Sequence, residues 1–361
     1  MNVLKRMSAL LSIGGMACLM SVCAMASSQD DLIKASKENE TVLHIYSNMG
    51  PENWRYIKEG FEAKYPWINV ETTDLGGSEV FTRYFAETGT GAPSADLMVT
   101  GSITDWIDFA NRGEAIDYQT VHSGDLPDWS MPMPGIYTFS TDPMLLAYNK
   151  VTVPEELRAR TFSDFAGAVE ANPDVFDGKI GTYDGALGFG QSINWAFLRD
   201  HGEPGWAMME KVGKAARPGG GSGGMIEKLV SGENSAALFV SSTVLFPRME
   251  GALNKLVEWT FFEDGTPVFL RGMAIPKQAK NVNAAKLMLD YIVSKEGQIA
   301  VGKGGFTPYR EDIDAEEVPY ETFGTIVDKT GGLVILINYD EDMIKGGDAF
   351  TARWKKTFNR N

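Results

Sequence analysis

Short apolar stretches alternate with amphipathic stretches over most of the chain. Residues 42–45 are apolar and predict a strand, and the following stretch spaces Trp54, Ile57 and Phe61 as on one face of a helix. The pattern then predicts a strand over 68–75, a helix over 78–87, a strand over 96–100 and a helix over 103–112. Strands that alternate with helices in this way indicate parallel pairing, so the predicted fold class is α/β.

The alternation continues far beyond the first hundred residues. Further strands or helices are predicted in the segments 144–150, 179–185, 193–202, 224–233, 235–240 and 271–277, and a longer amphipathic helix follows residue 283. The remaining tail is charged and aromatic, with helical patches. Alternation over this length indicates α/β layers arranged in two lobes.

The N-terminal residues have the layout of an export signal. Lys5 and Arg6 precede a long apolar stretch that ends in small residues at Ala24 and Ala26, so residues 1–26 are predicted to be a cleavable secretory signal. A retained membrane anchor and a lipoprotein attached through Cys18 or Cys23 are the alternatives. The prediction is a periplasmic protein.

Composition narrows the classes of partner. Both cysteines lie in the predicted signal, so core burial alone must hold the exported chain together, and the three histidines provide few soft metal ligands. The formal net charge of −15 disfavours binding to nucleic acid or to anionic membranes. A small anion bound locally is still compatible with this charge, because helix N-termini and a single arginine can hold one.

One motif points to catalysis, but its context does not. Gly220, Ser222 and Gly224 have the G-x-S-x-G spacing of a hydrolase nucleophile, which requires a preceding apolar strand and a later histidine. Here the preceding residues are polar and the last histidine is His201. A secreted serine hydrolase is therefore an alternative only, and we predict no catalytic residues, no metal and no cofactor.

Small and hydroxyl-bearing residues gather in the loops that follow the predicted strands. Ligands of open α/β sheets bind beyond the carboxyl ends of the strands. The candidate ligand-binding residues are Tyr46, Ser47, Asn48, Gly77, Ser78, Glu79, Ser102, Tyr183, Gly185, Ser241, Ser242 and Thr243, together with Ser222 in the glycine-rich turn.

The ordered set of segments resembles a known family. The segments "LHIYSNMGPE", "LGGSEVFTRY", "SADLMVTGSITDWIDFANRGEAIDY", "PMLLAYNK", "FDGKIGTYDG", "KLVSGENSAALFVSST" and "RGMAIPKQAKNVNAAKLMLDYIVSKEGQ" resemble periplasmic solute-binding proteins of ABC importers. The branch concerned includes ferric-ion-binding proteins and relatives for phosphonates and sugar phosphates.

This resemblance implies a two-lobed periplasmic binding protein fold with two crossing hinge strands and a ligand cleft between the lobes. Lobe I would comprise residues 41–142 and 270–305, and lobe II residues 143–269 and 306–361. The expected partners are a small solute and an inner-membrane ABC permease, and the expected state is a monomer. A sensor domain with the same fold is a further alternative.

The resemblance also bears on the ligand. Iron-binding members place a tyrosine pair where this chain has Ser241, Ser242 and Thr243, and some place a histidine where it has Asn48, although Glu79 is retained. Neutral hydroxyls cannot supply the negative charge that Fe(III) favours, so the resemblance does not extend to an ordinary ferric-ion site. A ferric-ion-binding protein with an atypical site is kept as the alternative function. Short hydroxyls and glycine amides suit the oxygens of phosphate, phosphonate or carboxylate groups, so we expect an anionic organic solute. Tyr46, Tyr183 or Trp195 would supply an apolar wall, and Glu79 would meet an amino or hydroxyl group.

Overall fold

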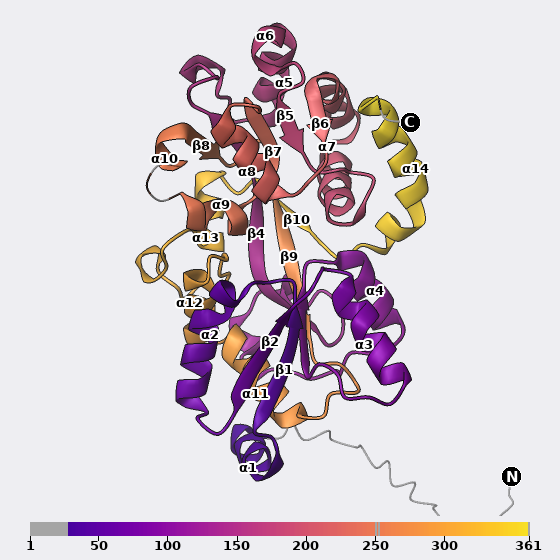
Figure 1. The fold of residues 1–361 in the computed structure, drawn as a ribbon, viewed down its shortest axis with the longest axis vertical. Coiled ribbons are helices and arrows are strands. Elements are labelled where there is room, and N and C mark those ends of the chain that lie inside the picture. Colours follow the sequence, from indigo (N-terminus) through magenta and orange to yellow (C-terminus); the bar gives the residue numbers. More distant parts are fainter. Residues whose placement is uncertain (1–27, 250, 252, 360–361) are drawn as a thin grey trace, which may run out of the picture.

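The structure is a computed structural model that describes residues 28–249, 251 and 253–359 (Figure 1). The predicted signal, residues 1–26, lies outside the described residues. No helix in the described part of the chain is both long enough and apolar enough to cross a membrane.

One hydrogen-bonded sheet runs through the molecule. Its strands follow the order β2-β1-β3-β9-β4-β7-β5-β6, with β10 beside β9 and β8 beside β4. The strands are β1 (Val42–Ser47), β2 (Asn69–Asp74), β3 (Leu97–Thr100), β4 (Ile136–Asn149), β5 (Ile180–Thr182), β6 (Ala216–Pro218), β7 (Ala236–Ser241), β8 (Val257–Thr260), β9 (Thr266–Ala274) and β10 (Val334–Ile337).

Helices cover this sheet at both of its ends. They are α1 (Gln29–Asn39), α2 (Pro51–Lys64), α3 (Glu79–Gly89), α4 (Ile103–Asn111), α5 (Phe162–Ala171), α6 (Pro173–Phe176), α7 (Gly188–Ala215), α8 (Ser222–Ser231), α9 (Ser242–Leu245), α10 (Leu253–Leu256), α11 (Val282–Val293), α12 (Lys295–Lys303), α13 (Phe323–Lys329) and α14 (Glu341–Thr357).

The sheet divides into two lobes joined by its two longest strands. β1 pairs in parallel with β2 and β3 in the first lobe, and β5 pairs in parallel with β6 and β7 in the second. β4 and β9 are antiparallel to each other and fully buried, and they run from one lobe to the other (Figure 1). The predicted two-lobed α/β fold with crossing strands is confirmed.

The buried apolar residues form clusters within the lobes, and the largest cluster extends across both lobes, from Trp106 in the first to Phe197 in the second. In the first lobe, Trp54, Ile57 and Phe61 of α2 are fully buried, as their spacing predicts, and they pack with α11, whose residues are buried on nearly every side. In the second lobe, Phe162 and Phe197 form an edge-on aromatic pair inside a larger ring cluster. Burial of these faces is what drives the alternating pattern of the sequence into layers.

The C-terminal segment contacts both lobes. Thr307 accepts a hydrogen bond from the backbone N–H of Thr141 at 3.0 Å, and the Tyr309 hydroxyl donates to the carbonyl of Thr138 at 2.6 Å. Further along, β10 pairs with β9, and α14 packs against α7 of the second lobe. The segment therefore joins the crossing strands to the outer helices.

Candidate functional site

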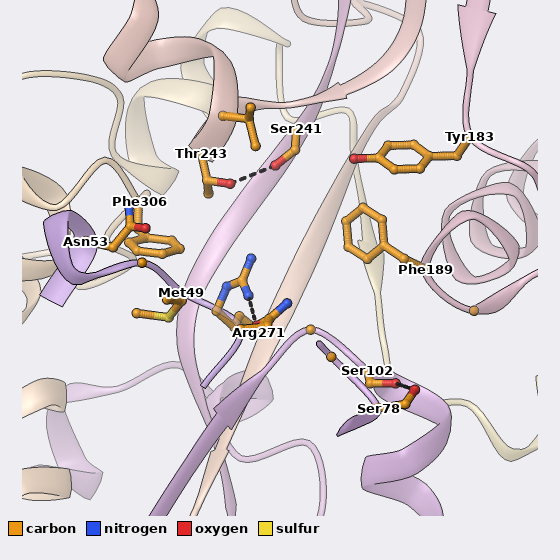
Figure 2. Close-up of a pocket in the computed structure, with 16 residues that line it drawn as sticks. Met49, Asn53, Ser78, Ser102, Tyr183, Phe189, Ser241, Thr243, Arg271 and Phe306 are labelled. Carbon is orange, nitrogen blue, oxygen red and sulfur yellow. Dashed lines mark hydrogen bonds between the residues drawn. The ribbon is translucent and has the colours of Figure 1, made fainter. Parts of the chain in front are cut away.

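A cavity of about 440 Å³ lies where the two lobes face each other across the crossing strands (Figure 2). Loops from both lobes and the crossing strand β9 contribute to it. Its lining consists of Asn48, Met49, Gly50, Asn53, Gly77, Ser78, Gly101, Ser102, Tyr183, Gly188, Phe189, Ser241, Thr243, Val244, Arg271 and Phe306.

The first lobe contributes a donor wall, which we define as Asn48, Gly50, Gly77, Ser78, Gly101 and Ser102. Gly50, Ser78 and Ser102 are the N-cap residues of α2, α3 and α4, so three helices begin at the cavity. The first turn of a helix carries N–H groups without intrahelical partners, and the helix dipole adds partial positive charge there. Three such ends therefore direct the positive ends of three helix dipoles at one cavity, although each first turn also carries an acidic side chain outside the lining, namely Glu52, Glu79 and Asp105.

These three helices lack side-chain caps, as do α7, α8 and α11, whereas some helices elsewhere in the protein have them. Among the described residues, none of the N-cap side chains of α2, α3 and α4 accepts a hydrogen bond from the first turn. By contrast, Ser28 caps α1 and Thr161 caps α5 by accepting from a backbone N–H. Instead, the hydroxyls of Ser78 and Ser102 lie 3.3 Å from each other. A dashed line joins these two side chains in Figure 2. In α3 the Val80 N–H donates to the carbonyl of Gly76 at 3.1 Å, so the other first-turn N–H groups of α3 and those of α4 are the ones that can bind a ligand.

The second lobe contributes the opposite wall, which we call the hydroxyl wall: Tyr183, Gly188, Phe189, Ser241, Thr243 and Val244. Gly188 is the first residue of α7 and has φ 39°, a left-handed conformation that glycine adopts without a steric penalty. α7 continues for 28 residues and is interrupted at Gly202 (φ 57°, ψ −145°). A fourth helix therefore begins at the cavity, opposite the donor wall.

A chain of hydrogen bonds holds Tyr183 at this wall. The Tyr183 hydroxyl lies 2.7 Å from the Ser222 hydroxyl and accepts from the Ser222 backbone N–H at 3.3 Å, and the Ser222 hydroxyl accepts from the Ser241 N–H at 2.8 Å. Burial raises the pKa of Tyr183, and the bonds to Ser222 offset part of that rise. Tyr183 therefore stays protonated, and its hydroxyl can donate into the cavity when Ser222 donates to it.

The hydroxyls of Ser241 and Thr243 lie 2.8 Å apart at the end of β7. Two residues earlier, Phe239 has φ 63°, and the pairing of β7 with β4 shifts register beside it. An irregularity of this kind turns a strand and redirects the side chains that follow. Here it brings Ser241 and Thr243 into the cavity, whereas Ser242 is fully buried behind them with no hydrogen-bond partner among the described residues.

Arg271 of β9 lies between the two walls, at the centre of Figure 2. Its Nε and Nη2 donate to Oδ2 of Asp142 on β4 at 3.1 and 2.9 Å, and its Nη1 donates to Oδ1 of Asn48 at 2.7 Å. One N–H on each of Nη1 and Nη2 is left without a partner among the described residues. Burial raises the pKa of Asp142, and Arg271 is the main group that opposes this rise. The pair thus joins the crossing strands and presents guanidinium donors to the cavity.

The same contact sets the orientation of Asn48. Because its Oδ1 accepts from Arg271, its Nδ2 amide group becomes a donor, and it lies on the side of Gly77. Asn53 is held the other way, with Nδ2 donating to the carbonyl of Gly304 at 2.8 Å. Asn48 therefore adds a donor to the donor wall, and Asn53 offers a carbonyl oxygen.

Apolar side chains complete the lining. Phe306 lies near Met49 and Asn53, and Phe189 lies beside Tyr183 on the other side of Arg271 (Figure 2). Phe189 packs on Phe269 with ring centroids 4.6 Å apart. The cavity thus combines a polar region around Arg271 with two aromatic surfaces, a composition typical of small-molecule sites.

The cavity brings together seven of the residues that the sequence predicts as ligand-binding: Asn48, Gly77, Ser78, Ser102, Tyr183, Ser241 and Thr243. Six predicted residues lie outside the lining. They are Tyr46, Ser47, Glu79, Gly185, Ser222 and Ser242.

The two first-lobe residues Tyr46 and Ser47 turn into the core because they still belong to β1. Tyr46 donates to Glu87 at 3.0 and 3.2 Å, and Ser47 accepts from the Trp54 indole N–H at 2.9 Å. The predicted apolar wall at Tyr46 is therefore wrong. The carboxylate of Glu79 is exposed and accepts from the Gly76 N–H at 3.0 Å, so it lies at the start of α3 and not among the lining residues.

The remaining predicted residues support the site from behind. Gly185 packs against Trp354, and Trp195 donates to Asp340 at 3.2 Å and stacks edge-on against Phe350, so neither lines the cavity. Ser222 is 2% exposed and positions Tyr183 and Ser241.

Ser222 also lacks the environment of a nucleophile. Each of the three histidines is engaged elsewhere: His44 pairs with Glu71, His122 pairs with Asp125, and both ring nitrogens of His201 contact backbone carbonyls. No histidine is therefore available to Ser222 as a base in the described part of the chain. The G-x-S-x-G spacing is that of a glycine-rich turn into α8.

Sequence reasoning missed Arg271, Asn53, Phe189 and Phe306. A cation inside the apolar strand 266–274 was a detectable signal, because buried arginines almost always have a partner. The partner, Asp142, is 129 residues away in sequence, and nothing local identifies it. Phe189 and Phe306 resemble ordinary core residues in the sequence.

The donor set of the cavity does not suit ferric iron. Among the described residues, no Asp, Glu or His lines the cavity, and no group of three metal-ligating side chains occurs elsewhere. Fe(III) prefers anionic oxygen ligands, and burial raises the pKa of Tyr183, which favours its neutral form in the metal-free cavity. The site instead offers N–H and O–H donors around one guanidinium.

Comparison with known families assigns the chain to a protein family. The family model described as "Bacterial extracellular solute-binding protein" matches residues 49–299, which is more than half of the chain. The chain belongs to this family. As an extracellular solute-binding protein, it is a member of a transport family and not of an enzyme class.

Solved structures show the same fold in this solute-binding protein. The substrate-binding protein of an ABC transporter from Agrobacterium tumefaciens is 20% identical, with a TM-score of 0.76 over 88% of this chain and 95% of that chain. Apo ferric ion-binding protein A from Pasteurella haemolytica is 18% identical, with a TM-score of 0.69 over 89% and 99%. Iron-bound HitA from Pseudomonas aeruginosa is 15% identical, with a TM-score of 0.67 over 88% and 99%. Among curated proteins, none matches this solute-binding protein.

Proposed function

We propose that this protein is the periplasmic solute-binding component of an ABC importer and that it captures a small anionic organic solute, such as a phosphonate, a phosphorylated compound or a carboxylate. The solute enters between the lobes, the lobes close around it by bending at the crossing strands, and an inner-membrane permease receives the closed form. Export through the signal over residues 1–26, a monomeric state, and the lobe boundaries at 41–142 with 270–305 and at 143–269 with 306–361 belong to the same proposal.

One observation carries the choice of an anion. The N-termini of α2, α3 and α4 begin at the cavity without side-chain caps, and Arg271 adds guanidinium donors beside them. Helix N-termini and arginine are the groups that proteins use to bind phosphate and carboxylate oxygens. An acidic protein can bind an anion in this way because the donors act at short range.

Binding of pooled solutes tests this proposal. Thermal unfolding of the purified protein should shift to higher temperature with pools of phosphonates, phosphorylated compounds or carboxylates, because a ligand that binds only the folded state stabilises it. Neutral sugars and polyamines should give no shift. A shift with those pools and none with any anion would contradict the proposal. Small-angle scattering should show compaction with any solute that shifts the melting temperature.

A charge placed at the donor wall provides a sharper test. Ser78→Asp puts a carboxylate at the start of α3, where it favours the helix but repels an anion, and a like charge a few ångströms away costs several kcal/mol. We expect about 100-fold weaker binding of the solute, which corresponds to about 2.7 kcal/mol. The matched control is Ser28→Asp, which caps α1 far from the cavity and should leave the affinity unchanged.

The ferric-ion alternative can be tested in the same assay. Two of the structural neighbours are named ferric ion-binding protein A and iron-bound HitA. Fe(III) should produce neither a thermal shift nor a visible charge-transfer band with this protein, because no carboxylate of the described residues lines the cavity. A visible charge-transfer band that appears when Fe(III) is added would favour the ferric-ion alternative.

A further inference from the structure

The cavity also limits the charge on the rest of the solute. This inference rests on the proposed function and concerns the same site. We propose that the site selects anionic solutes whose organic part carries no ammonium group, and that it discriminates against the zwitterionic amino counterparts of the same compounds.

The charges around the cavity are the first evidence. Arg271 is the single charged side chain in the lining, and among the described residues no carboxylate lines the cavity. An ammonium group brought into the closed cavity would lose water without gaining an opposite charge. Burying a charge without a partner is unfavourable, so the ammonium group would weaken the binding of the amino compound.

Three of the carboxylates near the lining are already engaged, whereas Glu52, which is exposed and lies against Gly50, does not itself line the cavity. Asp142 is fully buried behind Arg271 and accepts two of its N–H bonds. Asp105 accepts the hydrogen bond of the Ser102 hydroxyl, and Glu79 accepts the N–H of Gly76 and is exposed to solvent. Each of these groups would have to give up a hydrogen bond to meet an ammonium group.

The neutral part of the lining fits an uncharged organic group. Phe189 and Phe306 present aromatic surfaces on opposite sides of Arg271 in Figure 2, and Val244 and Met49 add aliphatic surface. The remaining acceptors there are neutral: the hydroxyls of Ser241 and Thr243 and the Oδ1 atom of Asn53. These oxygens can satisfy a hydroxyl group on the solute, but they cannot balance a full positive charge.

Matched ligand pairs test the inference. Propylphosphonate and 2-aminoethylphosphonate have the same number of heavy atoms and differ by CH₃ against NH₃⁺, as do propyl phosphate and O-phosphoethanolamine, and butyrate and β-alanine. Isothermal titration calorimetry at pH 7.5 measures each dissociation constant. Wherever at least one member of a pair binds, we expect the compound without the amino group to bind at least about tenfold more tightly than its amino counterpart.

The outcomes separate this inference from the proposed function. Equal affinities within a pair, or a preference for the amino compound, would overturn the inference and leave an anion-binding protein. No binding by any member of the three pairs would overturn both, because the anion-binding proposal requires at least weak affinity for these groups.

A carboxylate introduced into the lining should reverse the selection. Val244→Glu places an acid at the hydroxyl wall, and Val244→Gln is the control of equal size without the charge. Relative to the glutamine variant, the glutamate variant should favour the amino member of each pair by at least about tenfold. The ratio within a pair cancels any general repulsion of the shared anionic group, and circular dichroism verifies that both variants fold. An unchanged ratio would count against the inference.

Discussion

The two walls of the cavity bind by different means. The donor wall of the first lobe uses the backbone: α3 and α4 begin at Ser78 and Ser102, and their first-turn N–H groups have no side-chain cap among the described residues. The hydroxyl wall of the second lobe uses side chains, namely Tyr183, Ser241 and Thr243, each held by a hydrogen bond to another side chain. One wall is set by the path of the chain and the other by the identity of a few residues.

This difference separates general recognition from selectivity. Backbone donors are fixed by the fold and suit any oxyanion, so substitutions in the donor wall matter mainly when they add charge or block access. Side-chain hydroxyls can be exchanged one by one without a change of fold. The comparison predicts that affinity for anions depends on the donor wall and Arg271, and that preference among anions depends on the hydroxyl wall.

The largest effect is expected at Arg271, where the two walls meet. Arg271→Met leaves Asp142 buried without its partner, so the free energy of unfolding should fall by about 3–5 kcal/mol and anion binding should be lost. Urea unfolding measures the first effect and calorimetry the second. The double variant Asp142→Asn/Arg271→Met should recover most of the stability and none of the binding. Recovery of binding in the double variant would contradict the role given to Arg271.

The pH dependence of Arg271→Met gives an independent measure of the same pair. Burial raises the pKa of Asp142 and Arg271 opposes the rise, so removal of Arg271 should raise this pKa further. A carboxyl group with a raised folded-state pKa contributes stability that is present below its unfolded pKa of about 3.9 and is lost as the pH rises through the folded value. The stability deficit of the variant should therefore shrink as the pH falls from 8 to 5. A deficit that stays constant over this range would argue that Asp142 is not the charge left unpaired.

The next largest effect should come from Ser222, which supports the hydroxyl wall from behind. Ser222→Ala leaves the buried N–H of Ser241 without its acceptor and frees the Tyr183 hydroxyl, so the free energy of unfolding should fall by about 1–3 kcal/mol. Solute affinity should fall as well, because Tyr183 is no longer positioned. Ser222→Gly also removes the hydroxyl and should lower the free energy of unfolding as well. If Ser222→Ala unfolds with the same free energy as the parent protein, the proposed hydrogen-bond network is contradicted.

A smaller effect is expected at Tyr183 itself. Tyr183→Phe keeps the ring against Phe189 and removes one donor from the hydroxyl wall. The loss of one neutral hydrogen bond is worth about 1 kcal/mol, so the dissociation constant should rise about fivefold. Calorimetry of the variant measures this change. An unchanged affinity would show that the Tyr183 hydroxyl only stabilises the hydroxyl wall and does not bind the solute.

The smallest effects separate two neighbouring serines. Ser241 lines the cavity, and Ser242 is buried with an unpaired hydroxyl. Ser241→Ala should weaken solute binding by about twofold, in line with the loss of one neutral hydrogen bond of about 0.5 kcal/mol. Ser242→Ala should leave binding unchanged and leave stability equal or higher, because it removes a buried hydroxyl without a partner. Equal effects at both positions would break the distinction between lining and buried residues.

The pattern of the sequence predicts the elements of the fold well. The helix spacing of Trp54, Ile57 and Phe61 and the strands around it are local properties, since one face of each element must be apolar to be buried. The two-lobed arrangement required the resemblance of ordered segments as well. The loops after the strands were predicted to carry the ligand-binding residues, and the structure places Asn48, Ser78, Ser102 and Ser241 in the lining of one cavity.

What the sequence did not reveal depends on contacts between distant segments. Tyr46 and Ser47 were predicted to bind the ligand, but they are the last two residues of β1 and are buried in the core. The alternation of a strand does not show whether its final residues lie in the core or in the loop that follows. The pairing of Arg271 with Asp142 joins two crossing strands, and the aromatic surfaces of Phe189 and Phe306 come from segments more than a hundred residues apart.

The sequence by itself therefore determined the alternation of strands and helices, the resemblance to solute-binding proteins and the loops that carry the donors. Only the tertiary structure decided which donors line the cavity, which charged side chain lies among them and which carboxylates lie outside the lining. The physical reason is that periodicity reports burial along one element, whereas a binding site is made by the relative placement of several elements.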